Sequence, residues 1–232
     1  MKASTALLAL TAGALLAVAL GGARQAQLQA FDDVPNSEPE PVDGATDDGG
    51  VLSTVADAIN PFAVMQGNTM RSQALDPNVT AFLATLRYSE GTANQPDPYA
   101  VCYGYTHTVQ DFSDHPAVTH EWDGVPLDNL GPRYVGLKST AAGAYQIIKA
   151  TWLRAKAALH LADFGPESQD AAAVWLIDKR GALDDIKAGD IASACAKLWP
   201  EWASLPGSTA GQGGRRLDQL AQAFTDNGGT LA

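Results

Sequence analysis

The clearest pattern in the chain is a stripe of apolar residues at helical spacing that follows Asp76-Pro77. An Asp cap followed by a Pro at the first helical position is a typical helix start. Gly91 marks the end, because glycine readily takes the left-handed conformation that closes a helix. The pattern predicts a helix that ends at Glu90, and its apolar positions are Val79, Phe82, Leu83 and Leu86.

Further helices are predicted in the second half of the chain, between residues that start and stop helices. One stripe covers four turns and consists of Tyr145, Ile148, Trp152, Ala155 and Leu159. Pro166 starts a helix that reaches Arg180 and stops at Gly181. Asp190 starts another, with apolar positions Ile191, Ala194, Cys195 and Leu198. A last helix, closed by Gly228-Gly229, carries Leu217, Leu220, Ala221 and Phe224.

Residues 93 to 137 differ from these helices, because they are rich in Pro, Gly, Asp and His and are therefore predicted to be loops. Within them Val101, Tyr103 and Tyr105 alternate with smaller residues, which predicts a short strand or hairpin. The expected fold class is α+β and mainly α. A helical body carries a small irregular or β lobe, with a cleft between the two parts.

The amino-terminal segment 1–23 has the layout of an export signal. Ala3 to Ala23 carry no charge, Lys2 precedes them, and Gly21 and Ala23 suit cleavage before Arg24. The same uncharged span is also long enough to cross a bilayer, so a signal anchor, and a reversible one, stays open. Either way the body of the protein is expected to be exported, as a periplasmic or secreted protein or one tethered to the inner membrane.

Net charge divides the rest of the chain into two parts. The whole chain has a net charge of −11, and the stretch from Gln25 to Met70 holds eight acidic residues and no Lys or Arg. Residues 24–75 are therefore predicted to be an acidic, largely disordered linker with a short helix at Leu52–Ile59, before a compact domain at 76–232. Because the domain has no basic stripe, nucleic acid is not an expected partner.

The cysteine content allows two interpretations. The chain has only Cys102 and Cys195. In an oxidising compartment they could form one disulfide, and otherwise they are two buried thiols.

Glu90 is the first candidate for chemistry. It follows Leu86 by four residues and so shares the core-facing side of its helix. Loss of solvation there would raise the pKa of the carboxyl and keep a proton on it near neutral pH, as a general acid requires. The alternative is a Glu that only caps the helix end or reaches into water.

A second candidate is the small-residue string from Ser139 to Gly143 that leads into Tyr145-Gln146. Small residues let a backbone approach a ligand closely, and Tyr145 and Gln146 add an aromatic face and an amide. The alternative is a tight helix–helix contact. Trp152 and Trp175 are interpreted as core residues.

No metal or other cofactor is expected. The candidate ligands are His107, His115, His120 and Glu121, but their spacing does not place three ligands on one element.

From Asp76 to its end the chain resembles the phage-lambda-type lysozymes, which are endolysins with a lysozyme-like fold. The resemblance rests on several motifs in the same order over the whole domain. They are Phe82-Leu83, Ser89-Glu90-Gly91-Thr92, Phe112-Ser113-Asp114-His115-Pro116, Leu137-Lys138-Ser139-Thr140, Gly143, Tyr145-Gln146, Phe164, Ser168-Gln169-Asp170-Ala171, Arg180-Gly181-Ala182-Leu183 and Trp202-Ala203-Ser204-Leu205-Pro206-Gly207.

This resemblance implies cleavage of peptidoglycan glycan strands between N-acetylmuramic acid and N-acetylglucosamine, by a lytic transglycosylase. The protein is expected to be a monomer. The family's essential Glu falls on Glu90, which would act as acid and then as base while a 1,6-anhydro ring forms. Ser139, Tyr145, Gln146 and Gln169 match positions near the glycan cleft and are the implied substrate contacts.

Two other functions remain open. A hydrolytic lysozyme would need a second carboxylate roughly 5 to 9 Å from Glu90. The candidates are Asp111 and Asp114, although an Asp before His115-Pro116 is better explained as a turn former. A non-catalytic wall-binding module is the other alternative, and it would have no use for a protonated Glu90.

Overall fold

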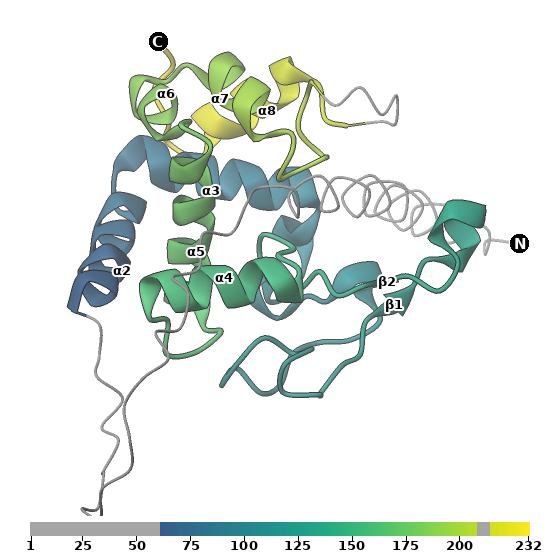
Figure 1. The fold of residues 1–232 in the computed structure, drawn as a ribbon. Coiled ribbons are helices and arrows are strands. Elements are labelled where there is room, and N and C mark those ends of the chain that lie inside the picture. Colours follow the sequence, from purple (N-terminus) through teal and green to yellow (C-terminus); the bar gives the residue numbers. More distant parts are fainter. Residues whose placement is uncertain (1–60, 208–213) are drawn as a thin grey trace, which may run out of the picture.

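The structure is a computed structural model that describes residues 61–207 and 214–232, and it is mostly helical (Figure 1). The leader predicted at 1–23 and the helix expected at Leu52–Ile59 lie outside these residues. In chain order the α-helices are α2 (Pro61–Ala74), α3 (Pro77–Glu90), α4 (Lys149–Leu159), α5 (Pro166–Lys179), α6 (Leu183–Ala188), α7 (Ile191–Leu198) and α8 (Leu217–Asp226). None of these helices is long and apolar enough to cross a membrane.

Helix α3 has the ends that its sequence predicts. The Asp76 carboxylate accepts hydrogen bonds from the backbone N–H groups of Asn78 and Val79, and Pro77 occupies the first helical turn. At the other end Gly91 takes a left-handed conformation, with φ of 78°, and its N–H bonds back into the last turn. Glu90 is therefore the last residue of a helix that is well capped at both ends.

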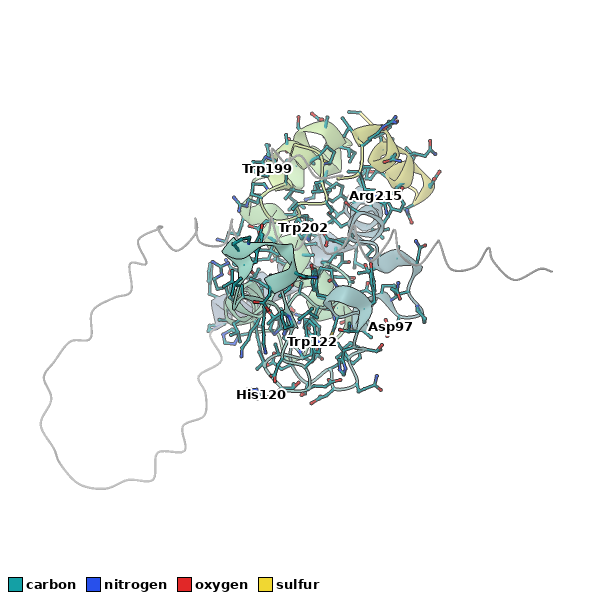
Figure 2. All side chains as sticks on the ribbon, turned by 90° about the vertical axis from the view of Figure 1, so that its right-hand side faces the viewer. Asp97, His120, Trp122, Trp199, Trp202 and Arg215 are labelled. Carbon is teal, nitrogen blue, oxygen red and sulfur yellow. The ribbon has the colours of Figure 1, made fainter. Side chains whose placement is uncertain are left out.

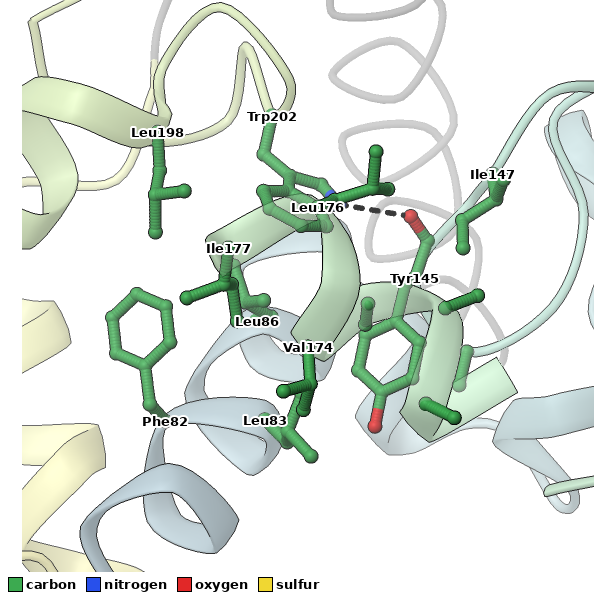
Figure 3. Packing of buried hydrophobic residues seen from close by; sticks show 14 of the residues in the cluster. Phe82, Leu83, Leu86, Tyr145, Ile147, Val174, Leu176, Ile177, Leu198 and Trp202 are labelled. Carbon is green, nitrogen blue, oxygen red and sulfur yellow. Dashed lines mark hydrogen bonds between the residues drawn. The ribbon is translucent and has the colours of Figure 1, made fainter. Parts of the chain in front are cut away.

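The main core lies between α3, α5 and α7 (Figure 3). Phe82 and Leu86 of α3 and Ile177 of α5 are fully buried there, together with Leu198 of α7. Trp202 is also fully buried, and its indole N–H donates to the Tyr145 carbonyl across 3.0 Å. This packing fixes the direction of α3, and hence the place of Glu90 at its end.

Helix α2 is a correction to the predicted boundary. The linker expected to reach residue 75 ends instead in a helix that begins at Pro61 and packs on α4 and α5. Its buried residues are Ala63, Gly67 and Met70. Because two of these three are small, the helix shows no clear apolar stripe in the sequence, yet small residues allow its backbone to approach its neighbours closely.

Helix α4 begins later than its stripe predicts, at Lys149 rather than near Tyr145. Gly143 and Gln146 have φ values of 76° and 50°, which are incompatible with a right-handed helix. Tyr145 thus belongs to an irregular turn, although it remains in the core. The short α6 was not predicted, whereas the Pro166, Asp190 and Leu217 helices are confirmed within a few residues.

The small lobe is built from short elements. Strands β1 (Val125–Pro126) and β2 (Lys138–Ser139) form an antiparallel pair with Val125 opposite Ser139. The short helices are η1 (Thr92–Asn94), η2 (Pro98–Ala100), η3 (Tyr103–Tyr105), η4 (Asp128–Leu130) and η5 (Pro132–Tyr134). Val101 pairs with Thr108 across an isolated antiparallel bridge that encloses η3, so a hairpin-like loop without strands lies where a short strand or hairpin was predicted. This arrangement agrees with the α+β prediction.

Candidate active site

Glu90 lies half-buried at the carboxyl end of α3, where the helix meets the small lobe. Its Oε1 atom accepts a hydrogen bond of 2.8 Å from the Ser204 hydroxyl. The Ser204 hydroxyl itself accepts one of 2.8 Å from Ser89. This chain of hydroxyl groups holds the carboxyl of Glu90 in one orientation.

Ser204 reaches Glu90 because of the buried turn that follows α7. Trp202 anchors this turn through its bond to the Tyr145 carbonyl, and Leu205 is fully buried beside it. Ser204 is almost fully buried as well, and its hydroxyl bonds to Glu90 and Ser89. The core thus positions the residue that orients the candidate acid.

Tyr105 contacts the same helix end from the small lobe. Its hydroxyl donates to the Gly91 carbonyl across 3.3 Å, and the side chain is 38% exposed. Burial of the hydroxyl raises the pKa of Tyr105, the negative charge of Glu90 raises it further, and the positive charge of Arg215 lowers it. A φ of 57° at a tyrosine is costly, and such strain is often found at functional sites.

Gly91 is needed for this contact. A Cβ atom at that position would lie 2.7 Å from the Tyr105 hydroxyl, and the φ of Gly91 is positive. A side chain in place of Gly91 would therefore displace Tyr105 and strain the helix end next to Glu90.

Two of the implied substrate contacts are deeply buried and bound to the protein itself. The amide of Gln169, 1% exposed, accepts from the Ala144 N–H and donates to the carbonyls of Tyr99 and Phe164. The Tyr145 hydroxyl donates to Asp170. In the described structure both residues support the turn before α4.

Ser139 and Gln146 are the other two implied substrate contacts. The amide of Gln146 donates to the carbonyls of Val101 and Gly143, and the Ser139 hydroxyl accepts from the Ala141 N–H. Both side chains are buried, and the bonds of Gln146 connect the turn before α4 to the segment at Val101. Their contact with substrate stays a prediction.

A polar network of Arg87, Tyr99, Tyr145 and Asp170 holds the last turn of α3, just before Glu90. Arg87 donates to the Tyr145 hydroxyl across 2.9 Å, and Tyr145 and Tyr99 both donate to Asp170. Burial raises the pKa of Asp170, while the bonds from the two tyrosines and the charge of Arg87 oppose the shift. The network connects α3, η2 and α5.

The candidate second carboxylates bind other parts of the protein. Asp114 accepts from the Trp152 indole at 2.7 Å and pairs with Lys156 at 2.5 Å. Burial raises the pKa of Asp114, but the bonds from Lys156 and Trp152 outweigh it, so the pKa lies below its ordinary value. Asp111 accepts from the Ser113 N–H and forms a turn.

The histidines have protein partners as well. His107 contacts Glu121 across 2.7 Å, and Glu121 also accepts from the N–H groups of Gln110 and Asp111. Within residues 61–207 and 214–232, no group of three His, Cys, Asp or Glu side chains is arranged to hold a metal ion.

Both cysteines are free and buried. Burial raises the pKa of each thiol to about 12, for Cys102 in the small lobe and for Cys195 on α7. Of the two interpretations left open by the sequence, the structure therefore has buried thiols.

Comparison with known proteins places this geometry in a lysozyme class. The structure matches the lysozyme of bacteriophage lambda complexed with a chitohexasaccharide, with a TM-score of 0.59 and 39% identity, over 68% of this chain and 98% of the lysozyme. A second structure of lambda lysozyme matches with a TM-score of 0.58 and 37% identity. The lysozyme-like fold predicted from the sequence is confirmed.

Sequence comparison defines the family more closely. The endolysin family model matches residues 80–231. The endolysin of Escherichia phage P2 is 40% identical over 159 residues, which are 67% of this chain and 95% of the relative. The endolysin of Escherichia phage lambda is 40% identical over 156 residues, 65% of this chain and 91% of the relative. The chain belongs to the endolysin family, and it is a peptidoglycan-degrading enzyme.

Reasoning from the sequence missed Ser204, which binds Glu90, Tyr105, which contacts the adjacent Gly91, and Arg215, which contacts Ser204. Ser204 lay within a family motif, but its direction toward Glu90 depends on the turn after α7. Tyr105 was interpreted only as part of a hairpin. Nothing in the local sequence of any of the three indicates proximity to Glu90, which is a tertiary contact in each case.

Proposed function

We propose that this endolysin is a lytic transglycosylase that cleaves the β-1,4 bond between N-acetylmuramic acid and N-acetylglucosamine, with Glu90 as acid and base. The observation that carries the proposal is the carboxyl of Glu90, half-buried at a capped helix end and oriented by Ser204. A positioned carboxyl of this kind is what proton transfer to a leaving oxygen requires.

The chemistry has two proton transfers and needs no water. Protonated Glu90 gives its proton to the glycosidic oxygen as the bond from that oxygen to C1 of muramic acid breaks. The resulting carboxylate removes the proton from the 6-hydroxyl of the same sugar, and the 6-oxygen bonds to C1. The product is a 1,6-anhydro ring, and Glu90 regains its proton.

The bond from Ser204 has a defined part in this scheme. It holds Oε1 during both transfers, and it supports the carboxylate form that exists between them. Because Ser204 is itself held by Ser89, the hydroxyl keeps its direction while the charge on Glu90 changes.

The contacts of the two candidate second carboxylates, Asp111 and Asp114, favour transglycosylation over hydrolysis. A hydrolytic lysozyme uses a second carboxylate as nucleophile or base. Asp114 is committed to Lys156 and Trp152, and Asp111 to its own turn. Mass spectrometry of the released muropeptides decides between the schemes, because an anhydro product is lighter than a hydrolysed one by one water. Products with the full mass would contradict transglycosylation.

The substrate class is supported by the lambda lysozyme complexed with a chitohexasaccharide. That ligand is an oligosaccharide, as a glycan strand is. We infer that strands of peptidoglycan pass over Glu90 and that the enzyme acts on them as a monomer without a cofactor.

Replacement of Glu90 by Gln tests the assignment. Glu90→Gln keeps the shape of the side chain but cannot donate a proton, so clearing of purified cell walls should fall at least roughly 100-fold while the melting temperature is retained. Glu167→Gln, at an exposed position in the first turn of α5, is the matched control and should clear walls normally.

Unchanged clearing by Glu90→Gln would exclude Glu90 as the acid. If the parent protein pulls down with insoluble wall but releases no fragments, it is a binding module and not an enzyme.

We also propose that the protein is exported through residues 1–23. The uncharged span after Lys2 supports this proposal, either as a cleaved signal or as an anchor that restrains the enzyme on the periplasmic side. Amino-terminal sequencing of the exported protein tests it. A start at Arg24 would exclude the anchor, and a protein retained in the cytoplasm would exclude export.

A further inference from the structure

Arg215 lies next to the candidate acid through a short series of contacts. Its backbone N–H donates to the Ser204 carbonyl across 3.0 Å, and the Ser204 hydroxyl donates to Glu90 across 2.8 Å. Figure 2 shows Arg215 on the same half of the molecule as Trp202, whereas His120 and Trp122 lie at the opposite end, in the small lobe. Arg215 thus contacts Ser204, the residue whose hydroxyl orients Glu90.

The side chain of Arg215 is held in place, but its polar atoms are not fully used. The guanidinium lies over the ring of Tyr88 with its central carbon 4.6 Å from the ring centroid. Its Nε atom is buried and has no hydrogen-bond partner within residues 61–207 and 214–232. A buried donor without a partner is costly and calls for an explanation, such as a ligand that binds there.

The next residue provides a contrast. Arg216 is exposed and forms an ion pair with Asp218 on α8. The two arginines carry the same charge and are neighbours in the chain, but only Arg215 is placed over Tyr88. Arg215 and Arg216 therefore differ in the position of the guanidinium and not in charge.

The charge of Arg215 also extends to the active site. Arg215 and Glu90 act in opposite directions on the Tyr105 hydroxyl, after the larger effect of burial. The charge of Arg215 thus acts on Tyr105, whose hydroxyl contacts the helix end next to Glu90. A positive charge at this place attracts an anionic ligand.

Space for such a ligand lies beside Tyr88. A hollow of about 860 Å³ lies between α3 and α8, and Tyr88 is one of its lining residues. The lining also includes the amides of Gln219, Gln222 and Asn227, the guanidinium of Arg87 and the carboxylates of Asp218 and Asp226. Amides of this kind can both donate to and accept from peptide groups.

We propose that Arg215 binds a carboxylate of the peptide stem on the muramic acid whose glycosidic bond is cleaved, and that the stem continues into the hollow between α3 and α8. This inference rests on the proposed function. The acetylated sugars of an intact strand are neutral, so its carboxylates belong to the stems. A planar guanidinium can bind a carboxylate through two parallel hydrogen bonds, which also fixes its direction.

The test measures binding without turnover, in full-length protein carrying Glu90→Gln. Two ligands are compared by calorimetry, namely stem-bearing glycan fragments and a neutral chitohexaose. Arg215→Gln should weaken binding of stem-bearing fragments about tenfold or more and leave chitohexaose binding unchanged. Arg215→Lys should recover part of the loss because it keeps the charge. Arg154→Gln, which removes an exposed positive charge on α4, is the matched control and should bind both ligands normally.

Several outcomes would overturn the inference. One is an equal loss of binding for both ligands, which would mean that Arg215 acts through Glu90 or the fold. The others are an equal effect of Arg154→Gln and no effect of Arg215→Gln on either ligand. Its failure is distinguishable from failure of the proposed function. Hydrolytic products would contradict transglycosylation and leave these binding differences intact.

Discussion

At the scale of single residues, the orientation of Glu90 depends on a hydroxyl that lies 114 positions further along the chain. The local sequence of α3 gives Glu90 its place at a helix end, but a helix end is a common place for a Glu. The bonds from Ser89 to Ser204 and from Ser204 to Glu90 are what make this carboxyl different from an ordinary helix-terminal one.

Removal of the Ser204 hydroxyl should therefore impair catalysis more than folding. A hydrogen bond to a charged group contributes about 1.5–3 kcal/mol, so Ser204→Ala should lower the rate of wall cleavage roughly tenfold or more. The rate of turbidity loss of a wall suspension measures the effect, and thermal unfolding measures stability.

Ser89→Ala is the matched control, because Ser89 contacts Ser204 and not Glu90 in these bonds. It should lower the rate less than Ser204→Ala does. Equal rates for Ser204→Ala and the parent protein would mean that the hydroxyl does not orient the acid.

At the scale of elements, the contact between α2 and α4 depends on the absence of a side chain at Gly67. A Cβ atom there would lie 2.3 Å from the backbone oxygen of Leu159, at the end of α4. Glycine in a helix interior is normally unfavourable by about 1 kcal/mol relative to alanine. Here close packing of two backbones outweighs that preference.

Gly67→Ala should consequently destabilise the protein, against the helix preference of alanine. The loss should be about 1–3 kcal/mol, as is typical of overpacking. Denaturant unfolding measures it. The matched control is Asn68→Ala on the exposed face of α2, which should leave stability nearly unchanged. A more stable Gly67→Ala protein would show that α2 can shift at no cost.

At the scale of the whole molecule, His115 joins the small lobe to the helical body. It is fully buried, and its ring packs edge-on against Phe164 with centroids 5.0 Å apart. The carbonyl of Ile147 can only accept, so the Nε2–H of His115 donates to it, and Nδ1 accepts from the Ala117 N–H. This pair of bonds requires the neutral ring.

Protonation of His115 should therefore weaken the fold in acid. Burial lowers the pKa of His115 from 6.5 to about 4. Because the unfolded chain then binds the proton more readily than the folded one, stability falls as the pH drops from about 6.5 toward 4. The total effect is about 3 kcal/mol.

Melting temperatures measured between pH 7 and pH 4 test this expectation. His115→Gln has no titrating ring, so its stability should depend much less on pH over this range. A parent protein whose melting temperature stays constant from pH 7 to pH 4 would contradict the assignment.

The sequence by itself determined the features that are local in the chain. The start of α3 at Asp76-Pro77, its end at Gly91 and the cap of α7 at Asp190 depend on bonds between residues a few positions apart. Composition likewise identified the loop-rich lobe. Glu90 was chosen as the candidate acid because its motif matched the family and its place on the helix could be read from the spacing.

Only the tertiary structure decided which residues surround Glu90 and where the packed body begins. Ser204, Tyr105 and Arg215 approach the end of α3 from different segments, and their nearness depends on packing across the core. Helix α2 was missed because two of its three buried residues, Ala63 and Gly67, are small and give no apolar stripe. Local rules act over a few residues, whereas these contacts join positions far apart in the chain.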